Sequence, residues 1–222
     1  GGLRPQTIIE LADAIGMAVP ASDAAALATW FAEKSDSGSL VEYLKTFDIT
    51  TGVMQTHEGL ARVAREFVLD LHADGVIYGE IRWAPEQHLS RGLTLDQTVE
   101  AVQEGLEAGA EEVRHAGGSI RVGQLVSAMR HADRGLEIAE LAVRHRNNGV
   151  VGFDIAGAEA GFPAGNLRDA FDYLAHHFFP ATVHAGEADG LDSIRGALFD
   201  GRALRLGHGV RLAEDVHTAR ED

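Results

Sequence analysis

Two histidines and one glutamate with the chemistry of a hydrolytic metal site lie near one another in the sequence. His184 and Glu187 are three residues apart in the apolar stretch ATVHAGEADG (181–190), and His208 lies in LRLGHGV (204–210). An imidazole can bind a metal ion, and a neighbouring carboxyl group can transfer a proton. The chain has no cysteine, so a metal ion here would have to be bound by imidazole and carboxylate groups.

A site with a catalytic zinc ion would use all three residues. Such an ion usually has about three protein ligands and an open position for a water molecule, whose pKa it lowers toward ~7. We expect His184 to be a metal ligand. We expect Glu187 to move a proton between water and substrate, a role typically worth ~10²–10⁴-fold in rate. His208 is expected to orient or stabilise the attacking hydroxide.

Short apolar runs rich in β-branched residues indicate the strands that position these groups. The runs begin 23 to 44 residues apart, and most are continuous, as in parallel strands that are buried on both faces. We expect five strands, which begin at Val76, Ile120, Val150, Ala181 and Leu204.

Helical patterns fill the segments between these runs. A capping box at Thr94 precedes apolar residues at helical spacing, and the helix is expected to end at Gly117. Another helix is expected from Thr56 to Asp74. Similar patterns cover roughly 133–146, 166–177 and 191–199. No linker or repeat interrupts the chain, so we expect a single domain over residues 1–222.

Alternating strands and helices are compatible with a doubly wound open sheet or with a (β/α)8 barrel. The G-x-G-x-x-G pattern of a dinucleotide-binding fold does not follow the first strand. Each run instead has its unusual polar residue near its C-terminal end, where the active sites of such barrels lie. We therefore predict a TIM-type (β/α)8 barrel of which this chain contains about five of the eight strands.

Several motifs resemble those of the adenosine deaminase family within the amidohydrolase superfamily. TVHAGEADG followed by RLGHGVRL is similar to that family's paired motifs, and GFDIAGAEAG is similar to its fourth-strand motif. GLRPQTIIELA and YLKTFDITTGVMQT resemble segments near its N-terminus. The resemblance covers nearly the whole chain. It implies zinc-dependent hydrolytic deamination of adenosine and 2'-deoxyadenosine, a small-molecule purine nucleoside as substrate, and one zinc ion per chain.

The resemblance also implies roles for single residues. His184 would be the zinc ligand, Glu187 the proton donor to the purine N1, and His208 the partner of the attacking water. The backbone N–H of Gly157 would bind the purine N3, although a tight turn also explains a glycine there. The family's H-x-H strand and its strand with two aspartates are expected to lie outside this sequence, together with the remaining zinc ligands.

An apolar stripe with i, i+3, i+4, i+7 spacing follows a capping box from Ser39 to Glu42. Such a stripe usually belongs to a helix core. In the family that the chain resembles, the corresponding helix covers the active site and packs near the nucleoside. We therefore name as substrate-contacting candidates Leu40, Tyr43, Leu44 and Phe47.

Structural roles are the alternative for most of the other polar residues. The chain has 11 histidines, and those in helices are expected to be solvated or to cap a helix. His184 taken alone would more often be a core histidine than a ligand. Asp154 and Glu159 are expected in salt bridges or caps at the C-terminal ends of the strands. Glu80 and Arg82 are expected to form a charged pair inside the barrel, without a chemical role.

Composition excludes several other functions. A formal net charge of −15 argues against general nucleic-acid binding, and no apolar run is long enough to span a membrane. The absence of cysteine fits a cytoplasmic protein and excludes the deaminases whose zinc is bound by cysteines. Amidohydrolases with two metal ions often bridge them with a modified lysine on a strand. Neither Lys34 nor Lys45 is expected on a strand, which favours one metal ion over two. The sequence does not indicate an oligomeric state.

Two alternatives to adenosine deamination remain open. A deaminase for another 6-aminopurine compound, such as adenine or aminodeoxyfutalosine, would have the same motifs. A non-catalytic fragment is the second alternative, because a single imidazole does not bind zinc tightly.

Overall fold

The fold was analysed in a computed structural model, which describes residues 2–36, 38 and 43–218. The chain forms two compact units, each described separately below. The first consists of Gly1–Ile81 and Pro85–Gly123, and the second of Arg82–Ala84 and Gln124–Asp222. The expectation of one domain over the whole chain stays a prediction.

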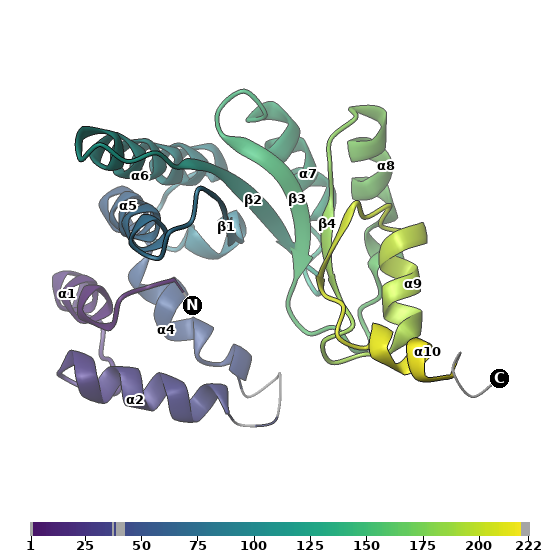
Figure 1. The fold of residues 1–222 in the computed structure, drawn as a ribbon, viewed down its shortest axis with the longest axis horizontal. Coiled ribbons are helices and arrows are strands. Elements are labelled where there is room, and N and C mark those ends of the chain that lie inside the picture. The colour runs from purple at the N-terminus through teal and green to yellow at the C-terminus, as the bar shows by residue number, and fades with distance from the viewer. Residues whose placement is uncertain (1, 37, 39–42, 219–222) are drawn as a thin grey trace. The chain divides into compact units, whose positions relative to one another are not determined.

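The first unit is mainly helical (Figure 1). Thr56 and Thr94 cap α5 and α6 through their side chains, and Gln97 completes the expected capping box with Thr94. The core beneath α1, α2 and α4 is apolar and centres on Ile8 and Leu27. The helices are α1 (Pro5–Ile15), α2 (Ala24–Ser35), α4 (Phe47–Val53), α5 (His57–Ala73), the 3-10 helix η1 (Pro85–His88) and α6 (Leu95–His115).

Five strands in the described part of the chain confirm the expected alternation of strands and helices. They are β1 (Tyr78–Trp83), β2 (Arg121–Met129), β3 (Val150–Ala156), β4 (Thr182–Ala185) and β5 (Arg205–His208). Strand β2 pairs in parallel with β3, and β4 pairs in parallel with β5. An isolated parallel bridge joins Phe153 to Ala181, so the order in the second unit is β2-β3-β4-β5. The full order of the three-stranded sheet is β1-β2-β3.

Helices of the second unit pack against the strands that they connect (Figure 1). Helix α7 contacts β3, and α9 contacts β4. Strands β2, β3 and β4 are buried over most of their length, and Phe153 and Ile155 of β3 are 0% exposed. These helices are α7 (Gly135–Arg144), η2 (Ala164–Leu167), α8 (Arg168–His176), α9 (Leu191–Phe199) and α10 (Leu212–Thr218). The parallel strands with intervening helices form part of a (β/α)8 barrel.

None of the helices in the described part of the chain combines the length and the apolar character needed to cross a membrane.

Candidate active site

The C-terminal ends of β4 and β5 bring the two predicted site histidines together. In the parallel register His184 lies opposite Gly207, and Ala185 lies opposite His208. The rings of His184 and His208 have their centroids 5.2 Å apart and are tilted by 41°. Because parallel strands end at the same edge of a sheet, residues that are 24 positions apart in the sequence share one site.

The contacts of His184 determine which ring nitrogen has the proton. Its Nδ1 lies 2.8 Å from Oδ2 of Asp154 and 3.1 Å from the carbonyl oxygen of Ile155. Its Nε2 lies 3.1 Å from Nη1 of Arg82. The carboxylate and the carbonyl can only accept, so Nδ1 donates; the guanidinium can only donate, so Nε2 accepts. His184 is therefore arranged as the neutral Nδ1–H tautomer with a lone pair on Nε2.

This tautomer suits a metal ligand. A histidine that binds a metal usually donates its other ring N–H to a carboxylate or a carbonyl, which fixes the ring and raises its basicity. Within the described residues no group of three or more histidine, aspartate or glutamate side chains is arranged to hold a metal ion. The geometry thus fits one imidazole ligand, and a cation at Nε2 would replace the contact with Arg82.

Glu187 and His208 form the second half of the site. Oε2 of Glu187 lies 3.4 Å from Nε2 of His208, and both side chains are more than a third exposed. His208 has a positive φ of 70°, an uncommon conformation for a residue with a side chain. Such conformations occur more often at functional sites. The structure therefore places a carboxyl group and an imidazole within reach of the same solvent-exposed position beside His184.

Glu159 organises the turn that carries Glu187. Its carboxylate accepts hydrogen bonds from the backbone N–H groups of residues 186–189 and from the Ser193 hydroxyl. Burial alone would raise the pKa of the Glu159 carboxyl, but the hydrogen bonds from Ser193 and from this backbone hold the pKa below its usual value. Glu159 thus holds the turn between β4 and α9, where the sequence led us to expect a salt bridge or a cap.

Two arginines near His184 were given no chemical role from the sequence. Arg82 forms an ion pair with the fully buried Asp154, with its Nε 3.3 Å from Oδ2. Arg130 donates to the carbonyl oxygens of Phe162, at 2.6 Å, and of His184. Burial lowers the pKa of the Arg130 guanidinium. Both arginines come from other strands or strand ends, and only the strand register brings them to His184.

The predicted substrate-contacting residues fall into two groups. Gly157 follows β3 directly and has a φ of 101°. Tyr43 and Leu44 lie in a short helical stretch of the first unit, and Phe47 begins α4 after a turn. The rings of Tyr43 and Phe47 pack edge to face, with their centroids 5.3 Å apart. Leu40 and the capping box of residues 39–42 lie outside the described residues. Substrate contacts by these residues stay predictions.

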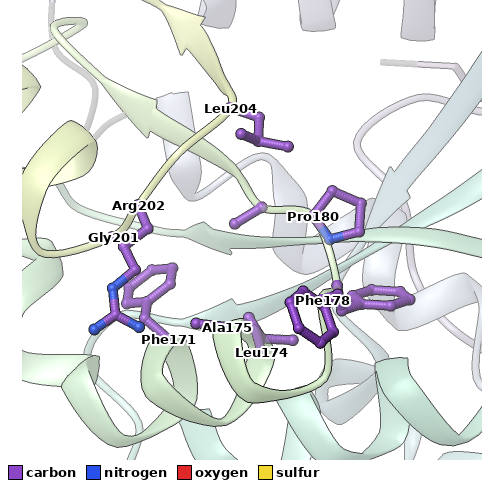
Figure 2. Close-up of a pocket in the computed structure, with 10 residues that line it drawn as sticks. Phe171, Leu174, Ala175, Phe178, Pro180, Gly201, Arg202 and Leu204 are labelled. Carbon is purple, nitrogen blue, oxygen red and sulfur yellow. The ribbon is translucent and has the colours of Figure 1, made fainter.

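An apolar pocket lies at the opposite ends of the strands from His184 and His208. It has a volume of about 290 Å³ and lies where the chain enters β4 and β5. Figure 2 shows side chains from α8 and from the segments before these strands around it, including Phe171, Leu174, Phe178, Pro180 and Leu204. It lacks the histidines and carboxylates of the candidate site, so we assign it no part in the chemistry.

Comparisons with known proteins agree with the motifs. A family model described as adenosine deaminase matches residues 1–220. Adenosine deaminase 1 of Streptomyces coelicolor is 58% identical over 217 residues, which are 97% of this chain and 55% of that protein. An adenosine deaminase of Mycobacterium ulcerans is 54% identical over 97% of this chain and 60% of its own length.

Among solved structures, an adenine deaminase from Arthrobacter aurescens superimposes with a TM-score of 0.81. The match covers 99% of this chain and 65% of that one, at 24% identity, and therefore concerns the fold. The chain spans between 55% and 60% of the length of the two curated relatives.

Proposed function

Because this chain belongs to the adenosine deaminase family, we propose that the protein hydrolyses adenosine and 2'-deoxyadenosine to inosine and 2'-deoxyinosine, with release of ammonia. The observation that supports this most directly is the grouping of His184, Glu187 and His208 at the ends of β4 and β5. A metal-binding imidazole, a proton-transferring carboxyl group and a second imidazole beside them suit the attack of a metal-activated water on the purine.

Zinc is the proposed metal, one ion per chain, with Nε2 of His184 as one ligand. When bound, zinc lowers the pKa of a water molecule toward ~7 and so supplies hydroxide at neutral pH. Asp154 contributes by holding Nδ1 of His184 at 2.8 Å, which keeps the lone pair on Nε2. The other zinc ligands are proposed to come from outside this sequence.

The proposed reaction assigns one task to each residue of the site. Water attacks C6 of the purine, the Glu187 carboxyl group protonates N1, and the resulting carboxylate accepts the proton that the water loses. Glu187 then passes this proton to the C6 amino group, which leaves as ammonia, and takes up the proton of the C6 hydroxyl as the carbonyl of the product forms. His208 orients the water during the attack. The backbone N–H of Gly157 binds N3, and Tyr43, Leu44, Phe47 and Leu40 cover the nucleoside.

We propose a role in purine metabolism and a cytoplasmic location, which the absence of cysteine supports. The proposed partner is a small-molecule purine nucleoside, with no role for nucleic acid or for a membrane.

Turnover of four purines tests the proposed substrate. The protein as its gene encodes it would be incubated with adenosine, 2'-deoxyadenosine, adenine and aminodeoxyfutalosine, and ammonia release would be measured. We expect the two nucleosides to react with the highest kcat/KM. Turnover of adenine or aminodeoxyfutalosine without turnover of adenosine would replace the proposed substrate.

The mass of the intact protein and its zinc content test the catalytic assignment. We expect about one zinc ion per chain in a protein that is longer than these 222 residues. A protein of this length with no bound zinc and no deaminase activity would instead be a non-catalytic fragment.

A further inference from the structure

The carboxylate of Glu159 accepts hydrogen bonds from five donors in one short stretch of the chain. Oε1 accepts from the Gly186 N–H at 2.5 Å and from the Ser193 hydroxyl at 2.6 Å. Oε2 accepts from the N–H groups of Glu187, Ala188 and Asp189 at 3.0, 2.8 and 3.1 Å. Glu159 itself is 4% exposed. A buried carboxylate with this many donors is fixed in place, and it fixes its donors in turn.

These donors form the connection between β4 and α9. Residues 186–189 follow β4 directly, and Ser193 lies in the first turn of α9. Gly186 has a φ of 74°, and a Cβ atom there would lie 2.6 Å from Cδ1 of Ile194. The connection is therefore tight, and α9 packs against its inner side. Glu159 joins the end of the strand to the start of the helix.

Glu187 is one of the residues held in this way. Its own N–H donates to Glu159, and its side chain reaches the His208 imidazole at 3.4 Å. Because its backbone is fixed from both sides, its carboxyl group has a restricted range of positions. The side chain of Glu187 is 36% exposed and its one ion pair is the 3.4 Å contact with His208 among the described contacts, so we infer that the backbone hydrogen bonds contribute most to its position.

We propose that Glu159 is a positioning residue of the deaminase site, which holds the 186–189 turn so that the Glu187 carboxyl group meets the substrate. The inference rests on the proposed function for its catalytic consequence, but the hold on the turn does not depend on that function. Glu159 does not touch the reacting atoms and acts through Glu187 alone.

An amide in place of the carboxylate is the sharpest change. In Glu159→Gln one oxygen becomes an NH₂ group, which is a donor and would face backbone N–H donors. Either the three N–H groups at Oε2 or the two donors at Oε1 lose their acceptor. A hydrogen bond to a charged group contributes more than a neutral one, so we expect the turn to open while the rest of the unit stays folded.

Backbone amide exchange tests the hold on the turn without reference to activity. We expect the amides of residues 186–189 to exchange at least about tenfold faster in Glu159→Gln than in the unchanged protein. The matched control is Glu66→Gln, since Glu66 is also buried and accepts from Thr7 and Arg62 in the first unit. Unchanged exchange at 186–189 in Glu159→Gln would overturn the proposal.

A double-mutant cycle tests the catalytic consequence. We expect Glu159→Gln to lower kcat for adenosine by about 10- to 100-fold, the size expected of a misplaced catalytic group, with KM changed less than about threefold. In a Glu187→Ala background the same change should alter kcat by less than about twofold, because the group that it positions is absent. An equal loss of kcat in both backgrounds would show a general structural effect and would refute the positioning role.

Two further outcomes are distinguished by this design. If the unchanged protein does not deaminate adenosine, the proposed function fails, whereas the exchange measurement still decides whether Glu159 holds the turn. If Glu159→Gln does not fold, Ser193→Ala replaces it, since that change removes one of the five hydrogen bonds and leaves the carboxylate. Faster exchange and a non-additive loss of kcat in Ser193→Ala support the proposal; their absence contradicts it.

Discussion

The carboxylate of Asp154 and the imidazole of His184 meet at 2.8 Å on the neighbouring strands β3 and β4. Asp154 is 0% exposed and also accepts from the Ser127 hydroxyl at 3.0 Å and from the backbone N–H of His184 at 3.2 Å. Arg82 pairs with the same carboxylate at 3.3 Å. Since a buried charge needs such partners, Asp154 is fixed, and it fixes the ring of His184 with the lone pair on Nε2, where Arg82 now makes its contact.

Asp154→Asn is expected to weaken zinc binding by about 10- to 100-fold, the usual effect of losing the carboxylate behind a ligating histidine. The amide can still accept from Nδ1, but it has no charge to raise the basicity of Nε2. Titration of the zinc-free protein in the presence of a competing chelator measures the change. Asp172→Asn is the matched control, because Asp172 pairs with Arg202 on a solvent-exposed surface. Equal zinc affinity in both variants would contradict a supporting role for Asp154.

Glu187→Ala is expected to lower kcat by about 10²–10⁴-fold, because the proton donor is lost. Zinc content should stay the same, since the proposed ligand in this chain is His184 rather than Glu187. Steady-state kinetics and metal analysis of the same preparation check both points. Glu137→Ala removes a surface glutamate that pairs with Arg134 at 2.6 Å, and it should leave both values unchanged. Loss of zinc together with activity would make Glu187 a ligand instead.

Sequence was sufficient for the strands and for most helix starts of this protein. Each strand is marked by a short apolar run rich in β-branched residues, so all five were predictable from local composition. The side chains of Thr56 and Thr94 cap their helices by accepting from backbone N–H groups only three residues away. Because these contacts are local, they can also be predicted from the sequence. The apolar stripe that includes Tyr43 and Phe47 shows where prediction from local spacing fails. These two residues have helical spacing, yet turn residues 45–46 separate them.

The candidate site was only partly predictable for a related reason. His184, Glu187 and His208 are marked by residue type and by their place at strand ends. Arg82 and Glu159 have no such local mark, because their contacts lie 102 residues away at His184 and 28 residues away at Glu187. Only the pairing of the strands and the path of the turn after β4 bring those partners together.

Gly157→Ala is expected to destabilise the protein by about 1–3 kcal/mol, because its φ of 101° is strained for any residue with a Cβ atom. That atom would also lie 3.3 Å from Cε of Met129 and 3.4 Å from Nδ1 of His131. Gly161→Ala is the matched control, since Gly161 has a φ of 84° with nothing within 4 Å of the added atom. Urea unfolding of both variants separates the backbone strain from the contacts.

Kinetics of the same two variants test the proposed contact with the purine N3. KM for adenosine should rise in Gly157→Ala, where the Cβ atom prevents close approach to the backbone, and should not rise in Gly161→Ala. An equal KM in both variants would place the purine elsewhere.

His88 is expected to make the stability of the protein depend on pH. It is 2% exposed, and burial lowers its pKa from 6.5 to about 4, although Nδ1 donates to the Met54 carbonyl oxygen at 2.8 Å. Between these two values the unfolded chain binds a proton that the folded chain does not. The contribution of His88 to stability is therefore complete above about pH 7 and is lost as the pH falls toward 4.

Urea unfolding at pH 7.5 and pH 4.5 measures this loss against a variant that cannot titrate. Since one pKa unit corresponds to ~1.36 kcal/mol, His88 accounts for about 2–3 kcal/mol of the difference between the two pH values. His88→Asn keeps a side-chain N–H for the Met54 carbonyl but has no group that gains a proton in this range. The unchanged protein should lose about 2–3 kcal/mol more than His88→Asn between the two pH values. Equal losses would mean that His88 is protonated in the folded protein as readily as in the unfolded chain.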